Sequence, residues 1–378
     1  MFFSGCRNIS PIGLDLGFDS IKMAQLILSK GQLRILAAQK NRFPSRLRHS
    51  REQSYQRTHF AVQAVDQALK SGKFKGRRAS LCVGKNVLDS ACIRFNGSPE
   101  QNERHNIQAH ARREFGLWDY EGAVDYLPAG EVRDGSEIHN EYLAFGGGDK
   151  ALQEQLAILE DMNLQCQAIE PKPCSVFRCF LDESRQADAD NEFFILVDMG
   201  ATSTVIVTAR GEQITWTRQI EFGGCDLTDL VARKLQLDPD DALEMRLQSN
   251  RKLNNNPHLE WGRKQVDLVL TDIIREKIEE LAEEIKLSQQ HHQQRFGGKA
   301  PADIWFCGGE AYATTTLELL GKSLNKKIRT KCCLESMDYS NLPFDDLAFG
   351  SQCSEWTTVF GLCLKNLQQT QDKLVQVS

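Results

Sequence analysis

A strand, a tight turn and a second strand occur twice in this chain, and each copy turns at an Asp-x-Gly sequence. The first copy covers residues 12–22 and the second covers residues 193–207. In both, an apolar run ends in Asp-x-Gly, small or polar residues follow, and a second apolar run begins, which indicates paired strands. A third strand follows each pair after a glycine turn, at Gly31 and at Gly211. This repeated layout predicts a duplicated lobe built on a three-strand meander.

The residues of these turns suit a phosphate ligand. Small side chains let backbone N–H groups approach phosphate oxygens, and an aspartate at a strand end can hold a hydrated Mg²⁺. The two aspartates are Asp15 and Asp198. Gly308 and Gly309 lie between an apolar strand and a helix, where glycines let a base and ribose lie against the backbone. Three such features in this order predict a nucleotide cleft.

Length and charge narrow the class of protein. A chain of 378 residues is long enough for two lobes with a cleft between them. A net charge of −5 gives no general attraction for nucleic acid. The start of the chain lacks a basic segment followed by an apolar one, and no run of about 18 apolar residues occurs. The sequence therefore predicts a cytoplasmic protein that binds no nucleic acid.

The region between the two meanders has its own pattern. Its order of strand, strand, helix, strand, strand, helix, strand predicts a compact α+β unit inserted into the first lobe. The predicted divisions are a first-lobe core at 11–77, the insertion at 78–170, a connector at 171–192, a second lobe at 193–354, and a C-terminal helix returning to the first lobe at 355–378.

A long amphipathic helix is predicted in the second lobe. Apolar residues recur at helical spacing between Val266 and Ile285, so one face is expected to be buried and the other charged. His291 and His292 follow this stripe. We interpret the pair as a solvated helix end and not as a metal site.

The order of these motifs resembles the actin-like ATPase superfamily, whose two related lobes hold a nucleotide's phosphates between paired hairpins. Within it, the chain is similar to the PilM family of type IV pilus assembly proteins, including the MshI branch of MSHA-type pili. The resemblance is carried by residues 13–22, 197–204 and 218–228, by Gly308-Gly309 and by Phe360-Gly361-Leu362. It implies an actin-like two-lobed α/β fold with a small α+β domain inserted in the first lobe, as in PilM and FtsA.

The resemblance also implies ATP and Mg²⁺ as cofactors, with Asp15 and Asp198 facing the metal. The phosphates would be held from two sides, by three residues of each lobe. These are Gly17, Ser20 and Lys22 in the first lobe, and Gly200, Ser203 and Thr204 in the second. Gly308 and Gly309 would border the adenosine.

Three residues depart from the family pattern. Phe18 and Asp19 occupy the first turn, where the family usually has small hydroxyl residues, and Glu310 replaces a third glycine. A carboxylate about 4 Å from a phosphate costs about 1 to 4 kcal/mol, depending on screening. We therefore expect nucleotide binding to be weak or lost. No residue has the spacing of a base that activates water, so we expect at most a weak ATPase.

The function that the resemblance implies is a scaffold at the inner face of the inner membrane. It would bind the cytoplasmic N-terminal peptide of a PilN-like bitopic membrane protein and link it to the pilus motor ATPase, meeting the membrane only through this partner. We predict the peptide site at residues 78–169 and their junction with the first lobe.

Two alternatives stay open from the sequence. One is a small-molecule kinase of the same superfamily, acting on a sugar or acetate, but no catalytic aspartate for it can be identified in the first lobe. The other is an FtsA-like cell-division or cytoskeletal protein. Such proteins end in an amphipathic membrane helix, whereas the tail at 366–378 is largely polar.

Overall fold

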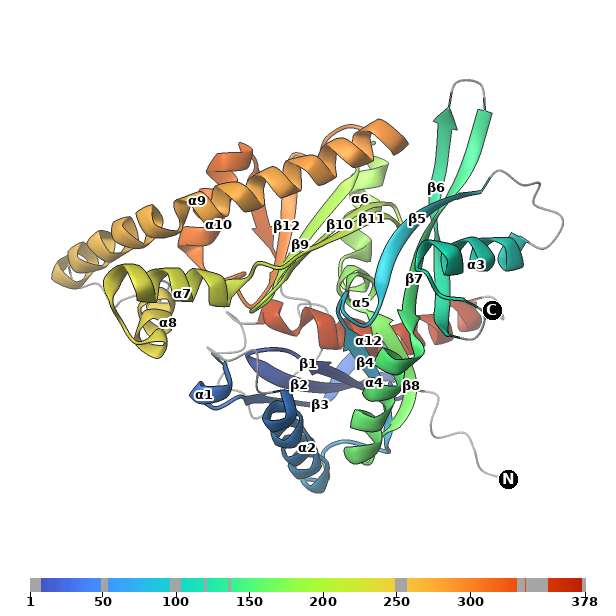
Figure 1. Cartoon of the computed structure of the whole chain (residues 1–378), viewed down its shortest axis with the longest axis horizontal. Helices are drawn as coiled ribbons and strands as arrows, with labels where there is room; N and C mark the ends of the chain where they lie inside the picture. The colour runs from blue at the N-terminus through green and yellow to red at the C-terminus, as the bar shows by residue number, and fades with distance from the viewer. Residues whose placement is uncertain are drawn as a thin grey trace.

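The strands of this protein form three sheets in two lobes and a side unit. The structure is a computed structural model that describes residues 8–48, 54–95, 103–118, 121–134, 137–248, 257–331, 337 and 353–375. Figure 1 shows the two lobes one above the other, with the smaller sheet at one side. Within the described residues, two sheets have five strands and one has three.

The first lobe is built on a sheet in the order β3-β2-β1-β4-β8. The strands are β1 (Ile12–Leu16), β2 (Ser20–Ser29), β3 (Gln32–Arg42), β4 (Arg78–Val83) and β8 (Gln165–Pro171). β1, β2 and β3 pair antiparallel, whereas β4 runs parallel to β1 and β8 runs parallel to β4. The short helix α1 (Ser45–Arg48) follows β3. Helix α2 (Ser54–Lys70) buries Ala61, Val65 and Ala68 in a core shared with Ile12 and Leu14.

The second lobe repeats this arrangement in the order β11-β10-β9-β12-β13. Its strands are β9 (Phe194–Met199), β10 (Thr204–Arg210), β11 (Gln213–Ile220), β12 (Asp303–Gly308) and β13 (Lys327–Thr330). Again three strands form an antiparallel meander, and two further strands add in parallel. The predicted duplication, and with it the two-lobed α/β fold, is therefore confirmed.

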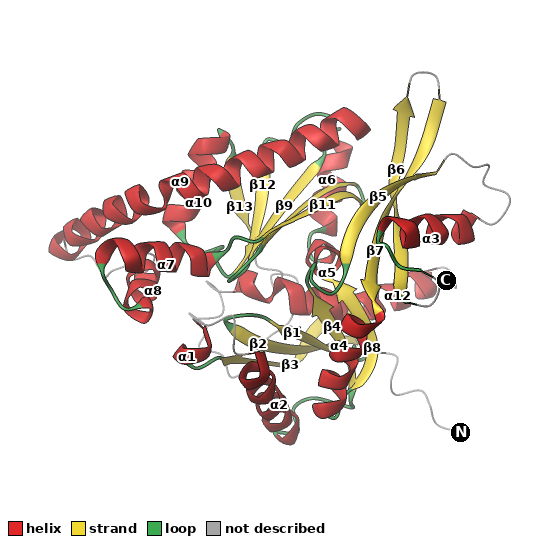
Figure 2. Ribbon diagram, in the orientation of Figure 1, coloured by secondary structure: helices red, strands yellow, loops and turns green. Residues whose placement is uncertain are grey.

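In the part of the second lobe that the structure describes, the helices are α7 to α10 (Figure 2). They are α7 (Gly224–Leu235), α8 (Pro239–Gln248), α9 (Pro257–Phe296) and α10 (Thr314–Leu324). The predicted stripe on α9 is buried at Leu270, Ile274, Ile278, Leu281 and Ile285, which pack in one core with β9 and β12. This burial confirms the amphipathic helix.

A three-stranded antiparallel sheet in the order β5-β7-β6 stands beside the lobes. It consists of β5 (Asp89–Phe95), β6 (Gly122–Asp134) and β7 (Glu137–Gly148), with α3 (Glu103–Glu114) packed on it and α4 (Asp149–Asp161) after it. The strands at the two ends of the predicted insertion, β4 and β8, pair within the first sheet. The separate sheet therefore spans residues 89–148, and the proposed division at 78 and 170 stays a prediction.

The last helix joins the first lobe to the connector. The connector contains α5 (Lys172–Arg178) and α6 (Leu181–Ala189), and the chain ends with the 3₁₀ turn η1 (Cys353–Trp356) and α12 (Thr357–Val375). Helix α12 packs on α5, β1 and β2. The backbones meet closely, because a Cβ added at Gly361 would lie 1.8 Å from the carbonyl oxygen of Ser175. A glycine at this crossing is therefore required.

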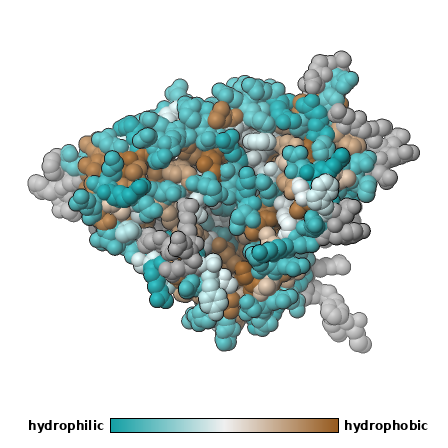
Figure 3. All heavy atoms as spheres, viewed as in Figure 1, coloured by the Kyte–Doolittle hydropathy of each residue, from teal (hydrophilic) through white to brown (hydrophobic). Residues whose placement is uncertain are grey.

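The visible surface is largely hydrophilic. Figure 3 shows hydrophobic side chains gathered mainly towards the left end, over α7 and α9. Leu268 and Val269 of α9 are among the exposed large apolar residues. Within the part of the chain that the structure describes, no helix has the length and apolar character needed to cross a bilayer.

The end of α9 is packed and not solvated, so the expectation for His292 was wrong. His292 is fully buried, its Nδ1 lies 2.7 Å from Oγ1 of Thr215, and its ring stacks on Phe193 at 4.1 Å between centroids. His291 lies against Trp216, with ring centroids 4.0 Å apart. Burial, reinforced by Arg210 and His291, lowers the pKa of His292 to about 3.

This buried imidazole predicts a loss of stability in mild acid. The pKa of His292 in the fold lies below its unfolded value of about 6.5, so its contribution is complete above pH 6.5 and is lost as the pH falls towards 3. Between about pH 7.5 and pH 5, wild type should lose about 2 kcal/mol more of its free energy of unfolding than His292→Asn. Urea titrations at several pH values measure this, and a pH-independent difference between the two proteins would contradict it.

Candidate functional site

A cleft between the two lobes gathers most of the residues that the sequence singled out. It has a volume of about 480 Å³ and is lined from the β1–β2 turn, the β9–β10 turn, the end of β12, the start of α5 and the end segment before α12. The predicted residues that line it are Asp15, Gly17, Ser20, Lys22, Asp198, Gly200, Ser203, Gly308 and Gly309. Their proposed roles toward a ligand stay predictions.

Thr204 is the one predicted residue that does not line this cleft. Its side chain is fully buried, and its hydroxyl donates a hydrogen bond of 2.7 Å to the carbonyl oxygen of Phe222. Ser203, one residue earlier, is at the cleft wall. Because side chains alternate along a strand, the first residue of β10 points inward, and Thr204 is corrected from a phosphate contact to a structural one.

The second-lobe turn is a tight backbone structure. The N–H of Gly200 donates to the carbonyl oxygen of Ser203 at 2.9 Å, and the N–H of Gly224, at the start of α7, donates to the carbonyl oxygen of Gly200 at 3.0 Å. Gly308 has φ +92°, and a Cβ there would lie 2.5 Å from Oδ1 of Asp198. Gly309 has no atom within 4 Å of an added Cβ, so this position faces open space.

Lys172 is the main site residue that the sequence reasoning missed. Its Nζ lies 2.6 Å from Oδ2 of Asp198, and both side chains are largely buried. Burial acts to lower the pKa of Lys172, but the charges of Asp198 and then Asp15 outweigh it, so the pKa is raised. The ammonium therefore stays charged beside Asp198, one of the two aspartates predicted to face a metal. The only sequence signal was a lysine between two prolines after β8.

A second missed residue, Glu355, lies beside two cations of the first lobe. Its carboxylate accepts hydrogen bonds from Lys40 Nζ at 2.7 and 2.8 Å and lies 3.7 Å from Lys22 Nζ. Glu355 is 8% exposed and belongs to the turn η1. Lys22 therefore faces the cleft as predicted, but with a carboxylate already beside it.

Arginines hold the two unusual residues of the first turn. Arg57 lies over the rings of Phe18 and Phe43, with 4.2 and 4.1 Å from its guanidinium carbon to the ring centroids. Asp19 accepts a hydrogen bond of 3.1 Å from Arg42. The negative charge that the sequence predicted beside a phosphate is therefore partly compensated.

Arg48 also links the lobes across the mouth of the cleft. Its Nη1 lies 3.9 Å from Asp19 in the first lobe, and its Nη2 donates at 2.8 Å to Asp240 of α8 in the second lobe. This pair is partly exposed, so it is expected to add little to stability. It ties α1 to α8 in the conformation described.

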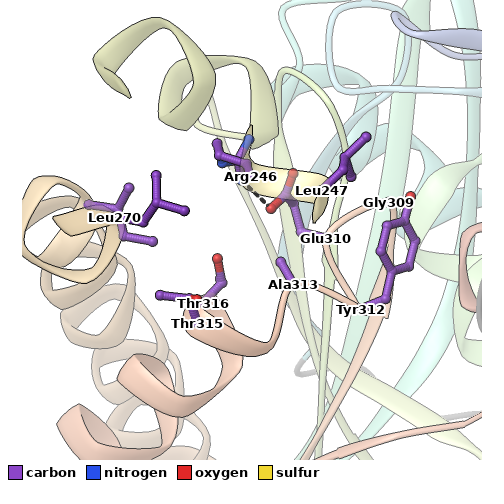
Figure 4. A pocket seen from close by; sticks show the side chains of 10 residues that line it. Arg246, Leu247, Leu270, Gly309, Glu310, Tyr312, Ala313, Thr315 and Thr316 are labelled. Carbon is purple, nitrogen blue, oxygen red and sulfur yellow. Dashed lines mark hydrogen bonds and ion pairs between the residues drawn. The ribbon is translucent and has the colours of Figure 1, made fainter. Parts of the chain in front are cut away.

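Glu310 fills the region beside Gly309. Figure 4 shows its carboxylate paired with Arg246, whose side chain comes from α8. Arg246 also donates to the carbonyl oxygen of Gly224 at 2.9 Å and to Oγ1 of Thr228 at 2.7 Å. The pocket around this pair, which reaches Leu270 and Thr316, has a free volume of only about 20 Å³. A purine therefore cannot enter it without displacing Glu310.

The cleft is lined by charges of both signs. Its walls carry five cations, Lys22, Lys40, Arg42, Arg48 and Lys172, and five carboxylates, Asp15, Asp19, Asp198, Glu310 and Glu355. No group of three metal-ligating side chains occurs among the described residues. A divalent cation about 4 Å from an ammonium would be repelled by about 8 kcal/mol at an effective dielectric constant of 20, twice the figure for unit charges. The same estimate gives an equal attraction to a carboxylate at that distance, so what excludes Mg²⁺ from Asp198 in this structure is that the Lys172 ammonium already lies against its Oδ2.

Comparison with known families identifies the chain. The sequence model for "Type IV pilus assembly protein PilM" matches residues 13–366. The chain belongs to the PilM family. A solved PilM-PilN type IV pilus biogenesis complex is similar in structure, with a TM-score of 0.75 and 18% identity over 94% of this chain and 98% of that one. At this identity the likeness shows the fold alone, which is actin-like.

A more distant relative also shares the fold of this PilM-family protein. The ethanolamine utilization protein EutJ from Carboxydothermus hydrogenoformans has a TM-score of 0.53 and 13% identity, covering 94% of this chain and 89% of that one. MreB 5 of Spiroplasma citri, solved with AMPPNP bound, has a TM-score of 0.48 and 10% identity, covering 97% of both chains. A search of curated proteins finds no significant match.

Proposed function

We propose that this PilM-family protein is a cytoplasmic scaffold of an MSHA-like type IV pilus assembly machine. It binds the cytoplasmic N-terminal peptide of a PilN-like inner-membrane protein and so works at the inner face of that membrane. The observation that carries this proposal is the family match over residues 13–366, together with the likeness to a structure of PilM with PilN. A further link to the pilus motor ATPase, which the family resemblance implies, stays a prediction.

A groove at the junction of the lobes and the side sheet supports a peptide site. It has a volume of about 310 Å³ and is lined by Leu88 just before β5, by Phe145 on β7, by Pro171 at the end of β8, and by Trp216 on β11. Trp216 is partly exposed. A partly exposed tryptophan in a groove is the type of residue that dominates peptide binding. This groove adjoins the insertion that the sequence favoured for the partner.

Titration calorimetry with a synthetic peptide tests the partner. The probe is the cytoplasmic N-terminal segment of the PilN-like protein of the same organism. Wild type should bind it, and Trp216→Ala should weaken binding by roughly tenfold or more. Trp118→Ala is the matched control, because Trp118 is 73% exposed and lies outside the groove. Failure of wild type to bind, or equal loss in both variants, would contradict the proposal.

We further propose that the cleft binds a nucleotide's phosphates and that binding there modulates the affinity for the peptide. Support comes from the paired turns, from the lysines and arginines among the lining residues and from a volume of about 480 Å³. Hydrolysis has no supporting geometry in what has been described, so we expect at most slow turnover. If the two ligands are coupled, each must change the affinity of the other by the same factor.

Position 309 offers a clean test of nucleotide binding. An added Cβ there meets no atom within 4 Å. Gly309→Phe should therefore fill part of the cleft without straining the fold, whereas Gly309→Ala should leave the cleft open. Calorimetric titration with ATP should show binding to wild type and Gly309→Ala, and a roughly tenfold or greater loss in Gly309→Phe. Repeating the peptide titration with ATP present measures the coupling. Unchanged ATP affinity in Gly309→Phe would place the ligand elsewhere.

A further inference from the structure

Lys172 pairs with Asp198 in the cleft, and Asp15 lines the same cleft. Asp198 is 2% exposed, and its Oδ2 lies 2.6 Å from Nζ of Lys172. Asp15, from the matching turn of the first lobe, lines the same cleft and acts electrostatically on this lysine. The ammonium thus lies where a cation shared by the two lobes would lie. This arrangement joins the connector to the turns of both lobes.

The lysine is held in this place by rigid surroundings. It is the first residue of α5 and lies between Pro171 and Pro173, whose rings fix the backbone angle φ on either side. Its side chain is 19% exposed. A Cβ added at Gly200 would lie 3.3 Å from its Nζ, so the ammonium lies near the backbone turn predicted to hold phosphates. The positive charge of Lys172 is therefore held beside this turn.

We propose that the ammonium of Lys172 takes the place of the divalent cation in this cleft, so that the site binds a nucleoside polyphosphate free of metal. The proposal rests on the nucleotide binding proposed above. A lysine ammonium offers a single charge and three donors, which can serve a carboxylate and a phosphate oxygen at once. Lys22 and Lys40 line the same cleft, with Glu355 beside them.

Manganese binding tests the cation position without any nucleotide. Mn²⁺ is titrated into the protein, and free Mn²⁺ is measured by electron paramagnetic resonance. Wild type should bind no Mn²⁺ tightly, Lys172→Met should gain one site, and Lys172→Met/Asp198→Asn should lose it again. If Lys172→Met is unstable, Mn²⁺ must raise its Tm more than that of wild type. A tight site in wild type, or none in Lys172→Met by either measurement, overturns the proposal.

ATP titration with and without Mg²⁺ tests the ligand. In wild type the affinity measured in EDTA should lie within about threefold of that in Mg²⁺. In Lys172→Met the affinity in EDTA should fall by roughly tenfold or more, and Mg²⁺ should restore part of it. Wild-type binding that requires Mg²⁺ overturns this inference and leaves the proposed nucleotide site standing. Absence of ATP binding under both conditions overturns both proposals.

Discussion

Replacing Arg246 by methionine is expected to lower the free energy of unfolding by about 3 to 5 kcal/mol. The guanidinium is 7% exposed and pairs with Glu310, and it also donates to the carbonyl oxygen of Gly224 and to Oγ1 of Thr228. Methionine fills much of the volume but leaves the carboxylate of Glu310 buried without its partner. The loss comes mainly from this uncompensated charge. Denaturant titration of the purified variant measures it.

A double variant separates the charge from the packing. In Arg246→Met/Glu310→Gln no buried charge remains, so most of the stability should return, to within about 1 kcal/mol of wild type. The hydroxyl of Thr228 still donates to Gly224 at 3.0 Å, so that carbonyl keeps a partner. If the double variant is as unstable as Arg246→Met alone, the ion pair is not the cause. The same double variant also removes the two charged groups from the pocket of Figure 4.

Adding one methyl group at Gly361 is expected to lower the free energy of unfolding by about 3 kcal/mol or more. Alanine is favoured over glycine within a helix by about 1 kcal/mol. At this position, however, the new Cβ would lie 1.8 Å from the backbone oxygen of Ser175. Backbone atoms cannot move aside as side chains do, so α12 and α5 must separate, and the cost of overpacking exceeds the gain. Thermal unfolding of Gly361→Ala should show a lower Tm.

Gly309→Ala is the matched control for this prediction. An added Cβ at Gly309 meets nothing within 4 Å, so the same chemical change should leave the Tm almost unchanged. Equal Tm values for Gly361→Ala and Gly309→Ala would contradict the close crossing of α12 and α5. Because α12 packs on β1 and β2, a displaced α12 would also shift the first-lobe wall of the cleft.

The two meanders could be predicted because their signals are local. Apolar runs, the Asp-x-Gly turns and the following glycine turns all lie within a few residues of one another, and each strand pairs with its neighbour in the chain. The family resemblance, which depends on the order of these motifs, was confirmed for the same reason. The parallel strands were harder to assign to a sheet, because β4 and β8 pair in the first sheet although a long stretch of chain separates them. Their strand patterns were visible in the sequence, but their sheet was not.

The side chains at the site also divide into those that local sequence could predict and those that only packing decides. Asp15 and Asp198 line the cleft because each ends a central strand beside a turn. Thr204 was assigned by its type, although the alternation of side chains along β10 turns it into the protein. Phe18 and Asp19 were recognised as unusual. The sequence did not show that Arg57 of α2 stacks on the ring of Phe18 or that Arg42 of β3 pairs with Asp19. These contacts form only when the elements pack together.

The sequence by itself determined the two-lobed fold, the paired turns and the glycines that leave room between them. Only the tertiary structure decided which charges meet in the cleft. Glu355 reaches Lys40 across 315 positions of the chain, and Lys172 meets Asp198 from a different element. Ion pairs have no sequence period, because any carboxylate can pair with any cation that the fold brings within about 4 Å. The charge balance of the cleft is therefore a property of the folded chain.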